Sequence, residues 1–199
     1  MVIVGALPPG SRINEVHLAA TLEVSRTPLR EAFARLVGET FLEARPRHGF
    51  YLRSMSVAEL EQLYVIRQHL DPWALTSAGV PSAEHIAELR RLNSVIARET
   101  GGALRRIELD DQWHLSLVRD CGNEVLLGLI KQMMLRTRRY EYAYFSRQPN
   151  VDVAIAEHNR ILDALDANDL DTAADVLRQN MTSATEPLRA WIEGANRDD

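Results

Sequence analysis

Four polar residues lie on helical stripes that are otherwise apolar, and together they could bind a metal ion. Asp110 and His114 are four residues apart, so both side chains leave the same face of a helix. His158 and Asn180 each replace an apolar residue on the inward stripe of a later helix. Two imidazoles and a carboxylate suit zinc, nickel or another first-row divalent ion, with positions left for water or an organic acid.

Each of these residues taken alone is more often a hydrogen-bonded group of a protein core than a ligand. Their occurrence on converging helices favours a site. Asp110 and His114 occupy two of the five inward positions of one helix, where an ordinary core stripe would carry apolar residues. We therefore predict a site for a divalent metal, zinc or nickel, on four residues: Asp110, His114, His158 and, as a weak ligand, Asn180.

The helices that must position these residues follow a junction near Ser54-Met55. Apolar spacing predicts about six helices with short connections over residues 55–199, as in a helical bundle. Pro72 should kink the first of them, because proline lacks a backbone donor and crowds the preceding turn. Pro187 should bend the last one for the same reason. This part of the chain is therefore predicted to be all helical.

Several arginines accompany the polar stripe. Arg67 lies beside the apolar stripe of the first body helix, and its guanidinium could clamp a carboxylate through two parallel hydrogen bonds. The alternative is a buried ion pair with an acid such as Asp71. Arg136, Arg138 and Arg139 cluster late in the fourth helix, and the sequence alone does not say which of them faces a pocket.

The segment Ser25-Arg26-Thr27-Pro28-Leu29-Arg30 is typical of a helix that enters a DNA groove. Ser25 suits the N-cap, where its hydroxyl can accept from an N–H group of the first turn. Arg30 follows Arg26 by one turn, so both guanidinium groups leave the same side. Basic and hydroxyl residues at a helix N-terminus favour reading of the major groove. The alternative is an ordinary surface helix that carries two arginines.

The surrounding residues predict a winged helix-turn-helix. A short helix over residues 15–22 precedes the Ser25 helix, and two strands over residues 41–45 and 49–53 follow it. Arg47 and His48 lie in the turn between the strands. They could be merely solvated, but the adjacent helix favours contact with a phosphate or a groove.

Charge is distributed unevenly along the 199 residues. The chain has a net charge of −5, yet residues 1–53 hold seven arginines and five glutamates, a net charge of +2. A slightly basic head on an acidic body fits a DNA-reading module joined to a second function. Cys121 is the only cysteine, so an internal disulfide is impossible and a reducing compartment is expected. Apolar runs stay short of the ~20 residues that a membrane span needs, and we see no signal peptide.

The string LPPGSRINEVHLAATLEVSRTPLREAFARLVGETFLEARPRHGFYL, residues 7–52, resembles the winged helix-turn-helix of GntR-family bacterial transcription regulators. The SRTPLREA core and the RHGF wing carry the resemblance. It implies operator contacts from five positions: Arg26, Thr27, Arg30, His48 and Gly49. Ser25 and Arg47 complete the DNA-binding set that we predict.

Two departures from the GntR pattern stand out. The helix that usually precedes the Leu-Pro-Pro-Gly segment is almost absent, because only Met1 to Val4 could be its last turn. Glu23 also stands where the family favours glycine. If the backbone there is left-handed, a non-glycine residue costs about 1–2 kcal/mol.

Residues 57–192 resemble the FCD domain, the all-helical effector domain of the FadR branch of the same family. The matching motifs include Asp110-Asp111-Gln112-Trp113-His114, Gly122-Asn123 and Glu157-His158. In many FCD proteins an aspartate and three histidines bind a metal, which with nearby arginines holds a small carboxylate effector. The resemblance assigns three of those ligands to Asp110, His114 and His158, and the remaining histidine falls on Asn180.

The asparagine leaves three outcomes open, because an amide oxygen is a weaker and neutral ligand. The metal could bind more weakly, a different metal could be chosen, or the site could work without metal. For the small carboxylate effector, we predict contacts from three residues: Arg67, Asn123 and Arg138.

These patterns predict a mainly α protein with two domains, a winged helix-turn-helix over residues 1–54 and an FCD-type domain for effector binding and dimerisation over residues 55–199. We expect a cytoplasmic homodimer that binds a palindromic DNA operator, responds to a carboxylate effector and is not an enzyme. One alternative is a ligand-binding protein whose truncated head no longer reads DNA. Another is a metal-dependent enzyme, although no separate general base or nucleophile stands at a defined spacing.

Overall fold

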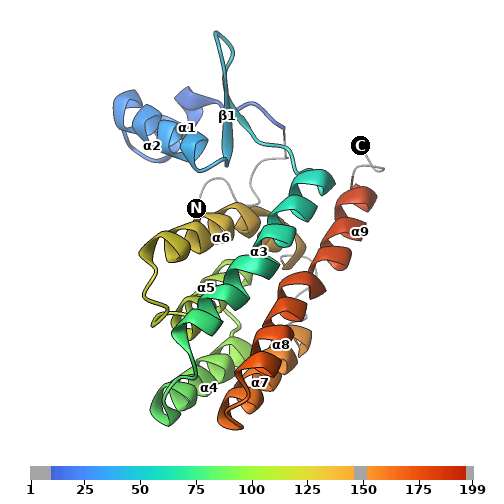
Figure 1. Ribbon diagram of the computed structural model, residues 1–199. Helices are drawn as coiled ribbons and strands as arrows, with labels where there is room; N and C mark the ends of the chain where they lie inside the picture. Colours follow the sequence, from blue (N-terminus) through green and yellow to red (C-terminus); the bar gives the residue numbers. More distant parts are fainter. Residues whose placement is uncertain (1–9, 146–151, 196–199) are drawn as a thin grey trace. The chain divides into compact units, whose positions relative to one another are not determined.

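The computed structural model describes residues 10–145 and 152–195. The chain divides into two compact units, residues 1–56 and 57–199, coloured blue to cyan and green to red in Figure 1. The division falls after Ser56, next to Ser54-Met55, where the sequence places the junction. The helical remnant predicted at Met1 to Val4 lies outside the described residues.

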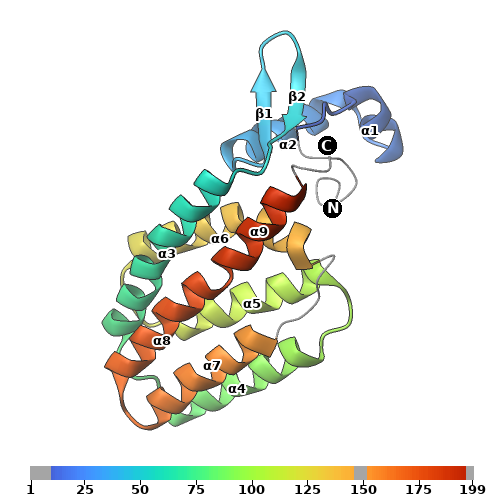
Figure 2. The same ribbon diagram turned by 90° about the vertical axis from the view of Figure 1, so that its right-hand side faces the viewer.

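The first unit is a winged helix-turn-helix, as predicted. Its elements are α1 (Glu15–Thr21), α2 (Arg26–Gly38), β1 (Leu42–Arg45) and β2 (Gly49–Leu52). The strands pair antiparallel, with Arg45 opposite Gly49, and form the hairpin visible in Figure 2. Leu29 and Phe33 of α2 are buried with Leu42 in a small core. This core fixes one face of α2 and leaves the other face in solvent.

The connection from α1 to α2 departs from ideal geometry at two residues. Glu23 has a φ of 53°, the left-handed conformation that strains any residue with a Cβ atom. Ser25 occupies the N-cap of α2 with an extended backbone, but its side chain makes no capping hydrogen bond. The prediction that its hydroxyl caps the helix is therefore wrong, and the exposed hydroxyl faces solvent instead.

The second unit is a bundle with seven helices in the part of the chain that the structure describes. They are α3 (Val57–Ala78), α4 (Ala83–Arg98), α5 (Ala103–Leu117), α6 (Glu124–Phe145), α7 (Asp152–Asp166), α8 (Leu170–Ser183) and α9 (Thr185–Ala195). The number exceeds the predicted six because the last predicted helix is two. Pro187 has no N–H to donate to the carbonyl of Ser183, and its ring crowds that carbonyl. The proline therefore ends α8 at Ser183 rather than bending one long helix.

Inside the bundle, α3 runs through Pro72 as one helix and packs against α6 and α8 (Figure 1). The α7 helix packs against α4 and α8, and α5 packs against α4 and α6 (Figure 2). Trp113 of α5 is fully buried, and its Nε1–H donates to the carbonyl of Leu89 over 3.1 Å. Helices α5, α7 and α8 thus bring the predicted metal ligands into one interior. Among the described residues, no helix is long and apolar enough to cross a membrane.

Candidate functional site

Asp110 and His114 of α5 and His158 of α7 lie together in the bundle, with both histidines buried and Asp110 half-buried. Each offers one ligand atom, and the three atoms lie within 4.8 Å of one another. Asp110 Oδ2 is 3.6 Å from His114 Nε2, and Asp110 Oδ1 is 3.7 Å from His158 Nε2. Ligand atoms about 2.1 Å from a tetrahedral ion lie roughly 3.4 Å apart, so one ion fits between these three side chains with small adjustments.

The ring of His158 is held with its Nε2 atom toward Asp110. Asn93 of α4 donates its amide hydrogens to Ile155 O and Asn159 Oδ1, so its own Oδ1 is an acceptor. His158 Nδ1, 2.9 Å from that oxygen, must therefore carry the proton, which leaves a lone pair on Nε2. Trp113 stacks on the same ring with centroids 3.7 Å apart. Both contacts fix the imidazole as metal-binding sites require.

Burial shifts the pKa of each of the three groups toward its neutral form. It lowers the pKa of His158 to about 3 and that of His114 well below its usual value, where the nearby His158 and Arg67 add to the effect. It raises the pKa of Asp110 to about 8, with further upward contributions from Glu141 and Asp111. Both imidazoles are therefore neutral, and able to act as ligands, at neutral pH.

Three buried polar atoms around this cluster have no hydrogen-bond partner among the described residues. They are His114 Nδ1, His158 Nε2 and Asn180 Oδ1. Buried polar atoms are nearly always satisfied in folded proteins, so unpaired ones call for a ligand or ordered water. His158 Nε2 and Asn180 Oδ1 must be acceptors, because His158 Nδ1 and Asn180 Nδ2 carry the hydrogens that those side chains donate. A cation satisfies acceptors. The residues thus fit a divalent metal ion.

A cavity of about 80 Å³ lies beside the cluster. Its polar lining comes from four helices and includes three of the predicted metal ligands: Tyr64 and Arg67 of α3, Arg106, Asp110 and His114 of α5, Glu141 of α6, and Asn180 and Ser183 of α8. Arg67 donates to Asp71 Oδ1 over 3.0 Å, so the ion pair considered from the sequence exists. The Nε of Arg67 has no hydrogen-bond partner among the described residues, and Arg67 still faces the cavity.

Tyr64 and Glu141 were not identified from the sequence. The hydroxyl of Tyr64 donates to Glu141 Oε1 over 3.0 Å at the cavity wall. Burial raises the pKa of Glu141, and nearby Asp111 adds to that shift. Asn93 was also missed, although it lies on the inward stripe of α4 between Leu89 and Ile96. A polar residue on an apolar stripe, the signal used for His158, could have found it.

Two predicted effector residues do not reach the cavity. Asn123 Oδ1 accepts from the backbone N–H of Leu126 over 3.0 Å and so caps the start of α6. Arg138 Nε donates to the buried Asp111 over 2.6 Å. Neither residue lines the cavity. Both side chains are occupied by local structural contacts, and the effector roles predicted for them are not supported.

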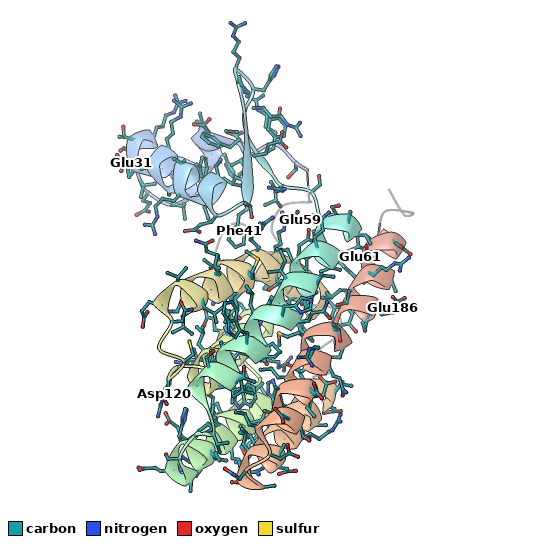
Figure 3. The ribbon with its side chains drawn as sticks, in the orientation of Figure 1. Glu31, Phe41, Glu59, Glu61, Asp120 and Glu186 are labelled. Atoms are coloured by element: carbon teal, nitrogen blue, oxygen red, sulfur yellow. The ribbon has the colours of Figure 1, made fainter. Side chains whose placement is uncertain are left out.

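The two other arginines of the basic cluster hold the start of α3. Glu59 lies in the first turn of that helix (Figure 3). Arg136 donates to Glu59 Oε1 over 2.8 Å, and Arg139 donates to Glu59 Oε2. These contacts tie α6 to the end of α3 that follows the hairpin in the chain. None of the three clustered arginines lines the cavity.

The head presents its predicted DNA-binding residues at the start of α2 and at the hairpin turn. The side chains of Ser25, Arg26, Thr27, Arg47 and His48 are exposed. The turn needs left-handed backbone at Arg47, with a φ of 64°, and the following glycine has a φ of 92°. That glycine, Gly49, is half-buried and offers only backbone for contact.

Arg30 is exposed but is not free. Its side chain is 60% exposed, and its Nε forms a 3.1 Å ion pair with Glu15 of α1. A groove contact by Arg30 must compete with this carboxylate. On the hairpin, the guanidinium of Arg45 lies 4.0 Å from the ring centroid of Tyr51 and pairs with Glu43. Arg45 is therefore held by two other side chains of the hairpin, unlike the exposed residues of the turn.

Two family models match the chain. Residues 1–52 match the model described as bacterial regulatory proteins, gntR family. Residues 62–183 match the FCD domain. One match falls in each of the two compact units.

Known relatives agree with these matches. The chain is 38% identical over 134 residues to the Nta operon transcriptional regulator of Aminobacter aminovorans; this match covers 65% of the chain and 63% of that protein, less than two thirds of its length. It is 30% identical over 192 residues to the probable D-xylose utilization operon transcriptional repressor of Paenarthrobacter nicotinovorans, covering 96% of the chain and 84% of that protein. The solved structure of E. coli McbR/YncC has a TM-score of 0.76 at 24% identity, over 94% of this chain and 91% of that one, which shows a shared fold.

A winged helix-turn-helix joined to a helical bundle with a polar cavity defines a DNA-binding transcription regulator with an effector domain. The matched families and relatives are regulators rather than enzymes. This chain belongs to the GntR family of bacterial regulatory proteins, and its bundle is an FCD domain.

Proposed function

We propose that a small carboxylate effector controls the operator affinity of this regulator, and that it binds with a divalent metal ion in the FCD cavity. The observation that carries the proposal is the pair of buried acceptor atoms that have no partner among the described residues, His158 Nε2 and Asn180 Oδ1. Each such atom costs about 1–3 kcal/mol unless a ligand satisfies it. Two neutral imidazoles with a carboxylate at 3.6 and 3.7 Å are a donor set for a first-row divalent ion.

Different side chains around the cavity bind the ion and the carboxylate. Asp110, His114 and His158 hold the ion, which supplies positive charge and open positions for a carboxylate oxygen. Arg67 faces the same cavity and offers an unpaired N–H for the acid. Glu141, with Tyr64 beside it, offers hydrogen-bonding partners for a polar substituent. A volume of about 80 Å³ favours an acid of a few carbon atoms.

The effector acts on DNA binding only through its different affinities for two states of the protein. We expect a homodimer, because one helix-turn-helix buries too little surface for tight specific binding and two heads read paired half-sites. The operator is then palindromic double-stranded DNA, and the regulator is cytoplasmic because its operator is there.

The DNA-binding role is tested with the promoter of the protein's own operon and the variant Arg26→Ala/Arg30→Ala. Each lost base contact costs about 1–3 kcal/mol, so operator affinity in an anisotropy titration should fall about 100-fold or more. Arg35→Ala removes an exposed charge from the last turn of α2 and serves as the control. Specific binding that survives the double change would exclude α2 as the reading helix.

The effector role is tested by thermal-shift screening of small carboxylic acids, with and without a chelator. Arg67→Met/Asp71→Leu replaces a buried ion pair by apolar residues of similar volume, a change that is often neutral for stability. This variant should keep the shift caused by metal alone and lose most of the further shift caused by the acid. The exposed Arg91→Met is the control for loss of charge. An acid that stabilises both proteins equally in chelator would contradict the proposal.

A further inference from the structure

The side chain of Asn180 in α8 has an orientation that the structure defines. It is 7% exposed, and its Nδ2 donates to Glu157 Oε2 over 2.8 Å. A carboxylate oxygen only accepts, so the amide nitrogen must be the atom that faces Glu157. The amide oxygen, Oδ1, points elsewhere, is buried, and has no hydrogen-bond partner among the described residues. Asn180 lines the same cavity as Asp110 and His114.

Glu157 is itself held in place. The hydroxyl of Ser183 donates to the same Oε2 atom over 2.9 Å, so this oxygen accepts from two side chains of α8. Glu157 also precedes His158 directly in α7. One helix therefore supplies a metal-ligand candidate and, on the next residue, the group that orients a side chain of the neighbouring helix.

We propose that Glu157 is a positioning residue of the metal site: it fixes Asn180 with its oxygen toward the cavity, so that the fourth protein ligand is a neutral oxygen. The inference rests on the metal site of the proposed function. It makes the donor set two nitrogens and two oxygens. Neutral oxygen suits manganese better than imidazole does, whereas imidazole suits zinc. Zinc still binds more tightly in absolute terms, so the expected effect is a smaller preference for zinc over manganese.

The positioning role is tested by measuring dissociation constants of the full chain for Mn²⁺ and Zn²⁺ in competition with a chelating indicator. Glu157→Leu and Asn180→Leu should each weaken Mn²⁺ binding by about 10- to 100-fold, the usual cost of losing an orienting partner or its ligand. The double variant should be no weaker than Asn180→Leu, because both changes remove one ligand.

Two controls separate positioning from general structural damage. Glu157→Gln keeps an acceptor oxygen for the Asn180 amide, so it should restore nearly full affinity. Gln179→Leu changes the neighbouring exposed residue of α8 and should alter affinity by no more than about twofold. Circular dichroism and urea unfolding in chelator show whether each variant is folded.

Asn180→His tests the oxygen ligand without removing a polar side chain. Its imidazole can donate one N–H to Glu157 and offer the other nitrogen to the ion. The preference for Zn²⁺ over Mn²⁺ should then rise on the order of tenfold. If Glu157→Leu fails to fold, this result still decides whether the Asn180 oxygen is a ligand, without which Glu157 has no ligand to position.

The outcomes distinguish the two proposals. If the wild-type chain binds both ions, and Glu157→Leu and Asn180→Leu bind them equally well, Glu157 does not position a ligand and the inference fails alone. An unchanged metal preference in Asn180→His overturns it too. If the wild-type chain binds neither ion, the metal site of the proposed function fails, and this inference falls with it.

Discussion

The head and the body carry their candidate binding groups in opposite environments. In the head, Arg26, Thr27 and His48 are exposed, so their polar atoms are open to solvent. In the body, His158 is fully buried and His114 nearly so, and each has a ring nitrogen without a partner among the described residues. An exposed site leaves no mark on the hydrogen bonding of the free protein, whereas a buried site does. The candidate interior site is therefore marked by unpaired buried atoms, whereas the candidate surface site is marked only by a local sequence motif.

The same contrast governs how binding couples to stability. Exposed side chains of the head can change with little effect on folding, because surface substitutions usually alter stability by less than about 0.5 kcal/mol. Buried unpaired groups of the body destabilise the free protein until a ligand satisfies them. We therefore expect ligand effects on unfolding to be confined to the body.

The largest expected effect is stabilisation of the body by metal. Zinc at 1,000 times its dissociation constant should raise the free energy of unfolding by about 4 kcal/mol, and His158→Ala should abolish most of the gain. All three tryptophans, Trp73, Trp113 and Trp191, lie in the body, so urea unfolding followed by tryptophan fluorescence reports on this unit. His48→Ala in the head is the matched control and should keep the full gain. If His48→Ala also lost the stabilisation by zinc, the effect of metal on unfolding would not be confined to the body.

The next effect is the pH dependence of metal affinity. Because burial raises the pKa of Asp110 to about 8, this carboxyl holds a proton below pH 8 that the ion must displace. The two histidines, with lowered pKa values, have none to lose at neutral pH. Zinc affinity should therefore rise about tenfold per pH unit from pH 6 to 8 and level off above.

Calorimetry in buffers of different ionisation enthalpy checks this pH dependence by counting the protons released. About one proton per ion is expected at pH 7, and Asp110→Asn should release none. Affinity that stays constant from pH 6 to 8 would mean that Asp110, whose side chain is 36% exposed, is already ionised over that range, and that the two units differ less in this respect than the pKa shift indicates.

The smallest effect concerns the head, where the destabilising feature is a strained backbone conformation rather than an unpaired polar atom. Glu23→Gly should relieve the left-handed strain at a φ of 53° and stabilise the head by about 1 kcal/mol. Hydrogen exchange of amides in α2 should slow by about fivefold, with metal affinity of the body unchanged. Glu23→Ala keeps a Cβ atom and should give no such slowing. Equal slowing in both variants would mean that Glu23 is not strained.

The sequence predicts most reliably what short-range patterns determine. Apolar spacing and turn residues identified α1, α2 and the hairpin of the head. A polar residue on an apolar stripe identified Asp110, His114 and His158, which the structure brings within 4.8 Å of one another. The break between α8 and α9 was not predicted. It arises because Pro187 cannot donate a hydrogen bond to the carbonyl of Ser183 and crowds it.

Contacts between distant helices could not be predicted in this way. Tyr64 pairs with Glu141, and Asn93 with His158, across more than 60 residues of sequence, and no local pattern links such partners. The direction of a side chain late in a helix also depends on its neighbours. For this reason Arg138, one of three adjacent candidates, turned out to bind Asp111 instead of facing the cavity.

The ion pair between Glu15 and Arg30 has a consequence for selectivity among DNA sequences. Arg30 reaches a base only if that base holds the guanidinium better than the carboxylate 3.1 Å away does. On random DNA the arginine can stay with Glu15, and the protein then loses one of its attractive charges. We expect an internal competitor of this kind to weaken loose association with the chromosome more than binding at the operator, so that Glu15 lowers affinity and sharpens discrimination.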